Sequence, residues 1–173
     1  MDFFVTGLPR SKTAWMSLYL TRDRFRCYHE LLAQAGVKQC MKFEHAVETV
    51  VGNSDSGLLL YYQQFVEQFP TSPWIHIIRD EDEVMESSIK FGIPKPNIEF
   101  AIYCRNQLRA DMNGDPNYLE IPFNFTDLDL EKVCEIIGMQ YHQNYTDYMR
   151  SYNIQMSEYQ KRKLLQHAGL DSM

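Results

Sequence analysis

The sequence predicts an α/β fold in which a parallel β-sheet is flanked by helices on both faces. Short apolar runs that end in turn residues alternate with segments whose apolar residues recur at helical spacing. The chain has 173 residues, a length typical of one domain. No repeat or low-complexity linker interrupts it. We therefore expect a single domain over residues 1–173.

A strand, a loop and a helix are predicted at the start of the chain. Residues 3–6 form a short apolar run that ends at Gly7 and Pro9, the pattern of a buried strand entering a turn. Apolar residues then recur at helical spacing over residues 12–22. The same alternation continues along the chain. It predicts strands at 49–51, 74–78 and 118–121, and helices at 58–69, 81–91, 98–113, 130–137, 143–152 and 157–167.

Polar residues follow the ends of several predicted strands. Asp80 stands just before the helix predicted at 81–91 and can cap it, and Glu83 three residues later predicts a capping box. Asp55 or Ser56 can cap the helix that begins at residue 58. Ligands of parallel α/β sheets bind at the carboxyl ends of the strands. We therefore expect the functional site at this edge of the sheet.

The charge and the cysteines argue against several classes of function. Lys and Arg number 17 against 23 Asp and Glu, and this net charge of -6 argues against a broad nucleic-acid interface. The four cysteines form no C-x-x-C pair, so we expect buried reduced thiols and no metal site. The apolar start is too short to span a membrane and lacks the basic residues of a signal peptide. We expect a cytoplasmic protein.

Residues 7–13, GLPRSKT, have features of a phosphate-binding loop. A Walker A loop has the pattern G-x-x-x-x-G-K-[ST] and surrounds phosphates with backbone N–H groups. This loop is one residue shorter and lacks the second glycine, but it keeps two cations and two hydroxyls between a strand and a helix. The start of that helix favours an anion. The alternative is a helix start with two exposed basic residues, and the loop alone leaves both open.

The same stretch is similar to the 5′-phosphosulfate loop of sulfotransferases that use 3′-phosphoadenosine 5′-phosphosulfate (PAPS). The family pattern is P-[KR]-S-G-T-x-[WL], and Lys12 replaces its glycine. Lys12 either adds a charge at the leaving phosphate or points outward. Trp15 matches the aromatic residue that flanks adenine in many of these enzymes, with a core position as the alternative. The resemblance implies a donor-binding loop made of Pro9, Arg10, Ser11, Lys12, Thr13, Ala14 and Trp15.

A second signature of the family occurs at the strand predicted at 74–78. In the family, an apolar strand ends in an arginine, and a serine eight residues later completes the 3′-phosphate site. Arg79 and Ser87 stand at these positions in WIHIIRDEDEVMESS. An arginine can make two charge-assisted hydrogen bonds to a phosphate. The alternatives are an ion pair of Arg79 with the adjacent acids and a solvent-facing Ser87.

The stretch RFRCYHE, residues 24–30, is similar to a segment of tyrosylprotein sulfotransferases that ends in the catalytic glutamate. Glu30 stands at that position and would accept the proton of the acceptor. His29 is the rival base, because imidazole titrates near neutral pH. Either residue can instead have a purely structural role.

The resemblance extends over about residues 3–138. It implies a P-loop-like sulfotransferase fold and transfer of a sulfuryl group from PAPS to a hydroxyl or amine, with adenosine 3′,5′-bisphosphate (PAP) as product. Arg10 and Lys12 would stabilise the charge on the leaving phosphate, without a metal. The acceptor would be a small molecule, a glycan or a peptide. Two alternatives stay open: a P-loop kinase with Asp80 as magnesium ligand, and a non-catalytic nucleotide-binding module.

Overall fold

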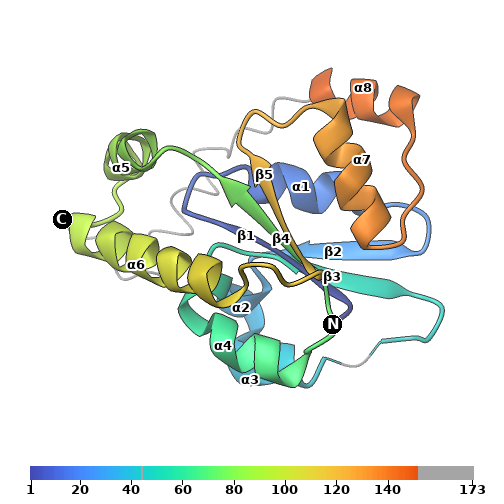
Figure 1. Ribbon diagram of the computed structural model, residues 1–173, viewed down its shortest axis with the longest axis horizontal. Coiled ribbons are helices and arrows are strands. Elements are labelled where there is room, and N and C mark those ends of the chain that lie inside the picture. Colours follow the sequence, from blue (N-terminus) through green and yellow to red (C-terminus); the bar gives the residue numbers. More distant parts are fainter. Residues whose placement is uncertain (44, 152–173) are drawn as a thin grey trace. The chain divides into compact units, whose positions relative to one another are not determined.

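The computed structural model describes residues 1–43 and 45–151, and these residues contain one parallel β-sheet (Figure 1). The strands are β1 (Phe3–Gly7), β2 (Phe25–His29), β3 (Val50–Ser54), β4 (Trp74–Ile78) and β5 (Tyr118–Pro122). Their order across the sheet is β2-β3-β1-β4-β5, and every neighbouring pair is parallel. The predicted α/β fold with a parallel sheet is therefore confirmed.

Helices cover both faces of this sheet. They are α1 (Thr13–Tyr19), α2 (Leu31–Ala35), α3 (Val37–Met41), α4 (Leu58–Gln68), α5 (Glu81–Lys90), α6 (Lys95–Asp111), α7 (Asp127–Ile136) and α8 (Gln143–Ser151). In Figure 1, α1 and α7 lie on one side of the sheet, and α2, α3, α4 and α6 lie on the other. None of the helices in the described ranges is long and apolar enough to cross a membrane.

Internal contacts divide the chain into two units, Met1–Gln143 and Asn144–Met173. The first unit contains the whole sheet and α1 to α7, and α8 crosses the boundary. The expectation of a single domain over residues 1–173 stays a prediction. The helix predicted at 157–167 lies outside the described residues.

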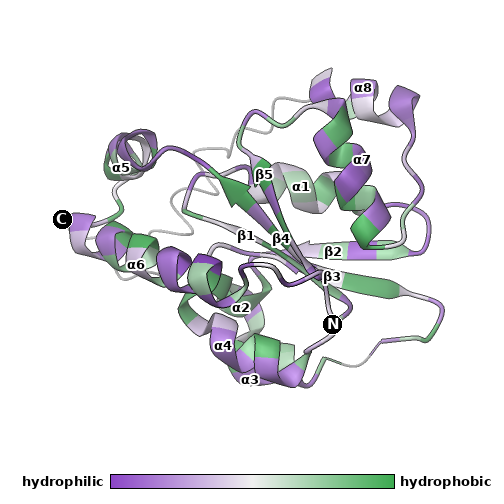
Figure 2. Cartoon of the chain, in the orientation of Figure 1, coloured by the Kyte–Doolittle hydropathy of each residue, from purple (hydrophilic) through white to green (hydrophobic). Residues whose placement is uncertain are grey.

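The sheet is held by apolar packing on both faces. On one face the ring of Phe4 packs against Phe65 and Trp74, with centroid distances of 5.4 and 4.7 Å. On the other face Tyr19 of α1 stacks on Trp15 at 5.1 Å. Figure 2 shows hydrophobic residues along the strands, and α7 alternates hydrophobic with hydrophilic residues. The cysteines are free and buried as expected: Cys27, Cys40, Cys104 and Cys134.

The sequence patterns do not predict β2, α2 or α3. In β2 the buried Phe25 and Cys27 alternate with the exposed Arg26 and Tyr28, because this strand lies at the edge of the sheet. The continuous apolar run expected of a buried parallel strand is therefore missing. Helices α2 and α3 have five residues each, too few to show a helical repeat.

The start of α5 matches the predicted cap only in part. Asp80 Oδ1 accepts a hydrogen bond from Glu83 N at 3.0 Å, so Asp80 is the N-cap. The predicted capping box is wrong, because the Glu83 carboxylate does not return to Asp80. Instead, Glu83 Oε2 accepts from Arg79 Nε at 3.3 Å. A positive charge four residues earlier competes successfully with the backbone N–H group for this carboxylate.

Candidate functional site

The loop with the phosphosulfate pattern follows β1, the central strand of the sheet. Gly7 ends the strand where the chain passes very close to β4. A Cβ at Gly7 would lie 2.9 Å from Ile77 O and 3.0 Å from the Ser11 Cβ. Both distances are too short for a larger residue, so this glycine lets the loop fold back over the carboxyl end of the sheet.

The backbone of this loop has an unusual conformation at two cationic residues. Arg10 has φ 69° and Lys12 has φ 61°, both in the left-handed region. This conformation costs a non-glycine residue about 1–2 kcal/mol. Lys12 thus keeps the backbone conformation that favours glycine, and glycine is what the sulfotransferase pattern has at this position. Loops with left-handed residues can aim successive N–H groups at one anion.

The Lys12 side chain neither points outward nor stands alone in the loop. Its Nζ donates to the carbonyl oxygen of Phe123 at 3.1 Å. The same atom lies 4.3 Å from the centre of the Phe123 ring and 5.0 Å from that of Phe125. Lys12 therefore ties the β1–α1 loop to the segment that follows β5.

Arg79 reaches the same place from the end of β4. Its Nη1 donates to the carbonyl oxygen of Arg10 at 2.7 Å, and its guanidinium carbon lies 4.3 Å from the centre of the Phe123 ring. The Arg10 guanidinium lies 4.8 Å from the centre of the Phe91 ring. The structure thus brings together the three predicted cations around two aromatic residues that sequence analysis missed. Phe123 stands two residues after the strand predicted at 118–121, close to the edge where ligands are expected, and this position could have indicated its role.

The hydroxyl residues of the two motifs have different surroundings. Ser11 Oγ is buried and has no hydrogen-bond partner among the described residues. The Thr13 carbonyl oxygen accepts from Ser54 Oγ at 2.8 Å, which ties the start of α1 to β3. Ser87 is half-buried on α5, and no hydrogen bond in the described ranges joins its hydroxyl to Arg79. The adjacent Ser88 carries a second buried, unpartnered hydroxyl.

The remaining residues of the predicted donor loop are less polar. Pro9 and Ala14 are half-buried. Trp15 is only 9% exposed, and its ring packs between Tyr19 and Phe125, with a centroid distance of 5.1 Å to each. This placement favours the core role for Trp15. Its contact with adenine stays a prediction.

The two candidate bases lie at the end of β2. His29 Nε2 and Glu30 Oε1 are 3.8 Å apart, and both side chains are about 30% exposed. Glu30 has φ 54°, again left-handed, and its N–H donates to Ser54 O at 3.1 Å. Burial raises the pKa of the Glu30 carboxyl. Burial also lowers the pKa of His29, although the nearby Asp55 opposes this shift. The shift of Glu30 favours a proton acceptor that works closer to neutral pH, whereas the shift of His29 makes the imidazole a weaker base.

Asp55 follows β3 and forms hydrogen bonds with several segments at the carboxyl edge of the sheet. Its Oδ2 accepts from Leu32 N at 3.0 Å and its Oδ1 from Gly57 N at 2.7 Å, so one carboxylate holds the starts of α2 and α4. The side-chain cap predicted for the helix at residue 58 is not formed as such: the N-cap of α4 is Gly57, and Asp55 holds the N–H group of this residue just before the helix. The Asp55 carbonyl oxygen accepts from Thr6 Oγ1 at 3.1 Å. This bond joins the ends of β3 and β1, so the candidate bases and the phosphate loop share one edge of the sheet.

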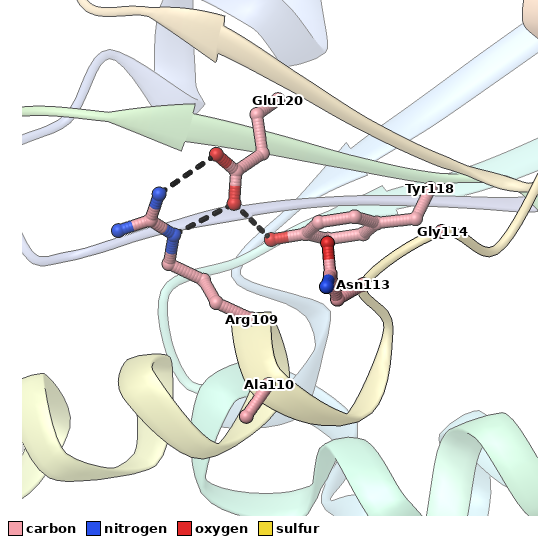
Figure 3. Close-up of a pocket in the computed structure, with 6 residues that line it drawn as sticks. All are labelled: Arg109, Ala110, Asn113, Gly114, Tyr118 and Glu120. Carbon is pink, nitrogen blue, oxygen red and sulfur yellow. Dashed lines mark hydrogen bonds and ion pairs between the residues drawn. The ribbon is translucent and has the colours of Figure 1, made fainter.

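A separate cavity of about 380 Å³ lies between α6 and β5 and contains none of the predicted site residues. It is lined by Arg109, Ala110, Asn113, Gly114, Tyr118 and Glu120 (Figure 3). Arg109 donates to both carboxylate oxygens of Glu120 at 2.7 and 3.0 Å, and Tyr118 Oη donates to Oε1 at 2.9 Å. The polar groups of the cavity thus bond to one another. This cavity belongs to the packing of α6 and not to the candidate site.

No acidic, histidine or cysteine cluster suited to a metal ion occurs in residues 1–43 and 45–151. The absence of a metal from the reaction stays a prediction. The kinase alternative assigns magnesium to Asp80, but Oδ1 of this residue already accepts from Glu83 N.

Comparison with known proteins identifies the fold. No protein-family model and no curated protein sequence matches this chain. Its structure is similar to that of mouse sulfotransferase SULT7A1 complexed with PAP, with a TM-score of 0.63 and 13% sequence identity. The match covers 86% of this chain but 62% of the mouse protein, so the chain spans less than two thirds of that sulfotransferase. The α/β fold is therefore the P-loop-like fold of sulfotransferases.

Proposed function

We propose that this protein transfers the sulfuryl group of PAPS to a hydroxyl or amine of an acceptor. The observation that carries the proposal is the meeting of Arg10, Lys12 and Arg79 at the carboxyl ends of β1, β4 and β5. These cations come together in a chain with a net charge of -6. Such a concentration of positive charge suits an anionic ligand with more than one phosphate.

The residues of the loop fit the 5′-phosphosulfate end of PAPS. Arg10 exposes its guanidinium beside the loop, and the left-handed residues shape the backbone for an anion. Among the described residues the buried Ser11 hydroxyl has no hydrogen-bond partner, an arrangement that costs stability unless a ligand satisfies it. We assign Arg10, with Lys12 close by, to the charge that develops on the leaving phosphate. Arg79 and Ser87 are assigned to the 3′-phosphate.

Glu30 is the group we assign to proton transfer. Its carboxylate is partly exposed at the same edge of the sheet, and burial raises its pKa toward neutrality. It would take the proton from the acceptor hydroxyl as the oxygen attacks sulfur. His29 lies beside it and stays the rival base. We also infer a cytoplasmic enzyme whose acceptor is a small molecule, a glycan or a peptide.

Calorimetric titration in the presence of a chelator tests the proposal. We expect adenosine 3′,5′-bisphosphate to bind, and Arg10→Gln to weaken that binding by about tenfold or more because a charge-assisted hydrogen bond is lost. Lys90→Gln is the matched control, since Lys90 is an exposed cation that pairs with Glu86 on α5. Binding of magnesium-ATP without binding of the bisphosphate would favour the kinase alternative and refute the proposal.

A further inference from the structure

The Arg79 guanidinium already has partners on both edges that could hold a phosphate. A guanidinium can take the two oxygens of an anion along the edge with Nε and Nη2, or along the edge with Nη1 and Nη2. Glu83 Oε2 occupies Nε at 3.3 Å, and Arg10 O occupies Nη1 at 2.7 Å. The ring of Phe123 covers one face of the group. A phosphate can therefore bind to both N–H groups of one guanidinium edge only when either the Glu83 or the Arg10 oxygen moves away.

Of these two oxygens, the one from Glu83 is the easier to displace. The Arg10 carbonyl is fixed by the backbone of the loop, whereas the Glu83 side chain is 61% exposed and can rotate into solvent. Arg79 itself is only 16% exposed, so it is the fixed member of the pair. The Asp80 cap on Glu83 N holds the first turn of α5 and keeps the carboxylate within reach of Arg79.

We propose that Glu83 is a specificity-determining residue that competes with the 3′-phosphate of the nucleotide for Arg79. This inference rests on the proposed function and names a residue that works against donor binding. The carboxylate satisfies Arg79 when no nucleotide is present, and it must leave before a phosphate can bind side-on. It therefore lowers the affinity for nucleotides that carry a 3′-phosphate and does not affect those that lack one.

The expected size of the effect follows from the exposure of Glu83. An exposed ion pair shifts an equilibrium by at most about fivefold, because water screens it. A carboxylate that stays near the bound phosphate adds repulsion of similar size. Removing the negative charge should therefore raise the affinity for adenosine 3′,5′-bisphosphate by about threefold to tenfold.

The test compares Glu83→Gln and Glu83→Ala with the wild type by calorimetric titration of adenosine 3′,5′-bisphosphate and of 5′-AMP. We expect both variants to bind the bisphosphate more tightly and to bind 5′-AMP as the wild type does. Glu86→Gln is the matched control. Glu86 is an exposed acid on the same helix and also forms an ion pair with a residue four positions away, Lys90, at 2.6 Å.

The outcomes separate this inference from the proposed function. If the wild type binds the bisphosphate and the Glu83 variants bind it equally well or more weakly, the inference is overturned and the proposed function stands. A gain of the same size in Glu86→Gln also overturns it, because net charge alone then explains the effect. If neither the wild type nor any variant binds the bisphosphate, the proposed function falls, and this inference falls with it.

Discussion

Polar residues gather in two regions of the sheet, and the backbone differs between them. At the carboxyl ends of the strands, Arg10, Lys12 and Glu30 all have left-handed backbone conformations. In the described part of the chain, the only other non-glycine residue with positive φ is Asp23. Under α6, by contrast, the polar residues of β4 and β5 stand on regular strands. Left-handed non-glycine residues thus occur in the loop after β1 and at the end of β2, both at the carboxyl edge of the sheet.

The region under α6 is a network of side chains joined by hydrogen bonds. His76 Nδ1 lies 2.7 Å from Tyr118 Oη, which donates its single hydrogen to Glu120. His76 must therefore donate from Nδ1, and its buried Nε2 is an unprotonated acceptor with no partner in the described part of the chain. This network stabilises the packing of β4, β5 and α6. The strained edge, which gives up stability, is the better candidate for function.

Of the substitutions that distinguish the carboxyl edge of the sheet from the network under α6, we expect Glu30→Gln to have the largest effect, a loss of turnover. Glu30→Gln keeps the shape of the side chain but removes the proton acceptor, so turnover should fall by about 10²–10⁴-fold while the affinity for adenosine 3′,5′-bisphosphate stays the same. Steady-state kinetics with an identified acceptor and calorimetry measure the two quantities. His29→Gln is the matched variant. If it loses the activity and Glu30→Gln keeps it, His29 is the base.

Two arginines provide the next contrast. Arg79→Ala should weaken binding of adenosine 3′,5′-bisphosphate by about 10–100-fold, through lost charge-assisted hydrogen bonds, and weaken binding of 5′-AMP far less. Arg109→Ala should leave both affinities unchanged and lower the free energy of unfolding, because Arg109 holds Glu120 under α6. Titration of both nucleotides and urea denaturation separate these outcomes. Equal losses of both nucleotides in Arg79→Ala would show that Arg79 does not read the 3′-phosphate.

Most of the sheet could be predicted from the sequence, because β1 and β4 are largely apolar runs and β5 is a short strand with apolar residues around Glu120. The edge strand β2 could not, since Arg26 and Tyr28 interrupt its apolar pattern. The meeting of Arg10 and Arg79 follows from the rule that ligands bind at the carboxyl ends of parallel strands. The direction of the Lys12 side chain could not be predicted in this way, because its partner Phe123 is 111 residues away in the sequence. The ion pair between Glu83 and Arg79 could not be predicted either, because it depends on how the first turn of α5 places the carboxylate.

The network under α6 should give the protein a characteristic loss of stability in acid. Burial lowers the pKa of His76 from 6.5 to about 3, although Glu120 lies 4.0 Å from Nδ1 and opposes this shift. The unfolded chain therefore binds a proton below pH 6.5 that the folded protein does not bind until about pH 3. The contribution of His76 to stability is complete above this range and is lost as the pH falls through it.

Urea denaturation at several pH values measures this loss. We expect the free energy of unfolding to fall by about 1.5 kcal/mol between pH 6.5 and pH 5 on account of His76. In His76→Leu the fall should be smaller by that amount. His29→Gln measures a separate contribution, because burial also lowers the pKa of His29 and acts in the same direction. An unchanged pH dependence in His76→Leu would refute the assignment.

The smallest effect tests the strain at the phosphate loop itself. Lys12→Ala and Lys12→Gly both remove the contacts of Nζ with Phe123 and Phe125, but only glycine adopts φ 61° without cost. The glycine variant should therefore be more stable than the alanine variant by about 1 kcal/mol, measured by urea denaturation. The control pair is Ala14→Gly, where glycine lies inside α1 and should destabilise by a similar amount. Equal stability of the two Lys12 variants would mean that residue 12 leaves the left-handed conformation once the lysine is removed. The side-chain contacts of Lys12, rather than a backbone shaped for an anion, would then be the cause of that conformation.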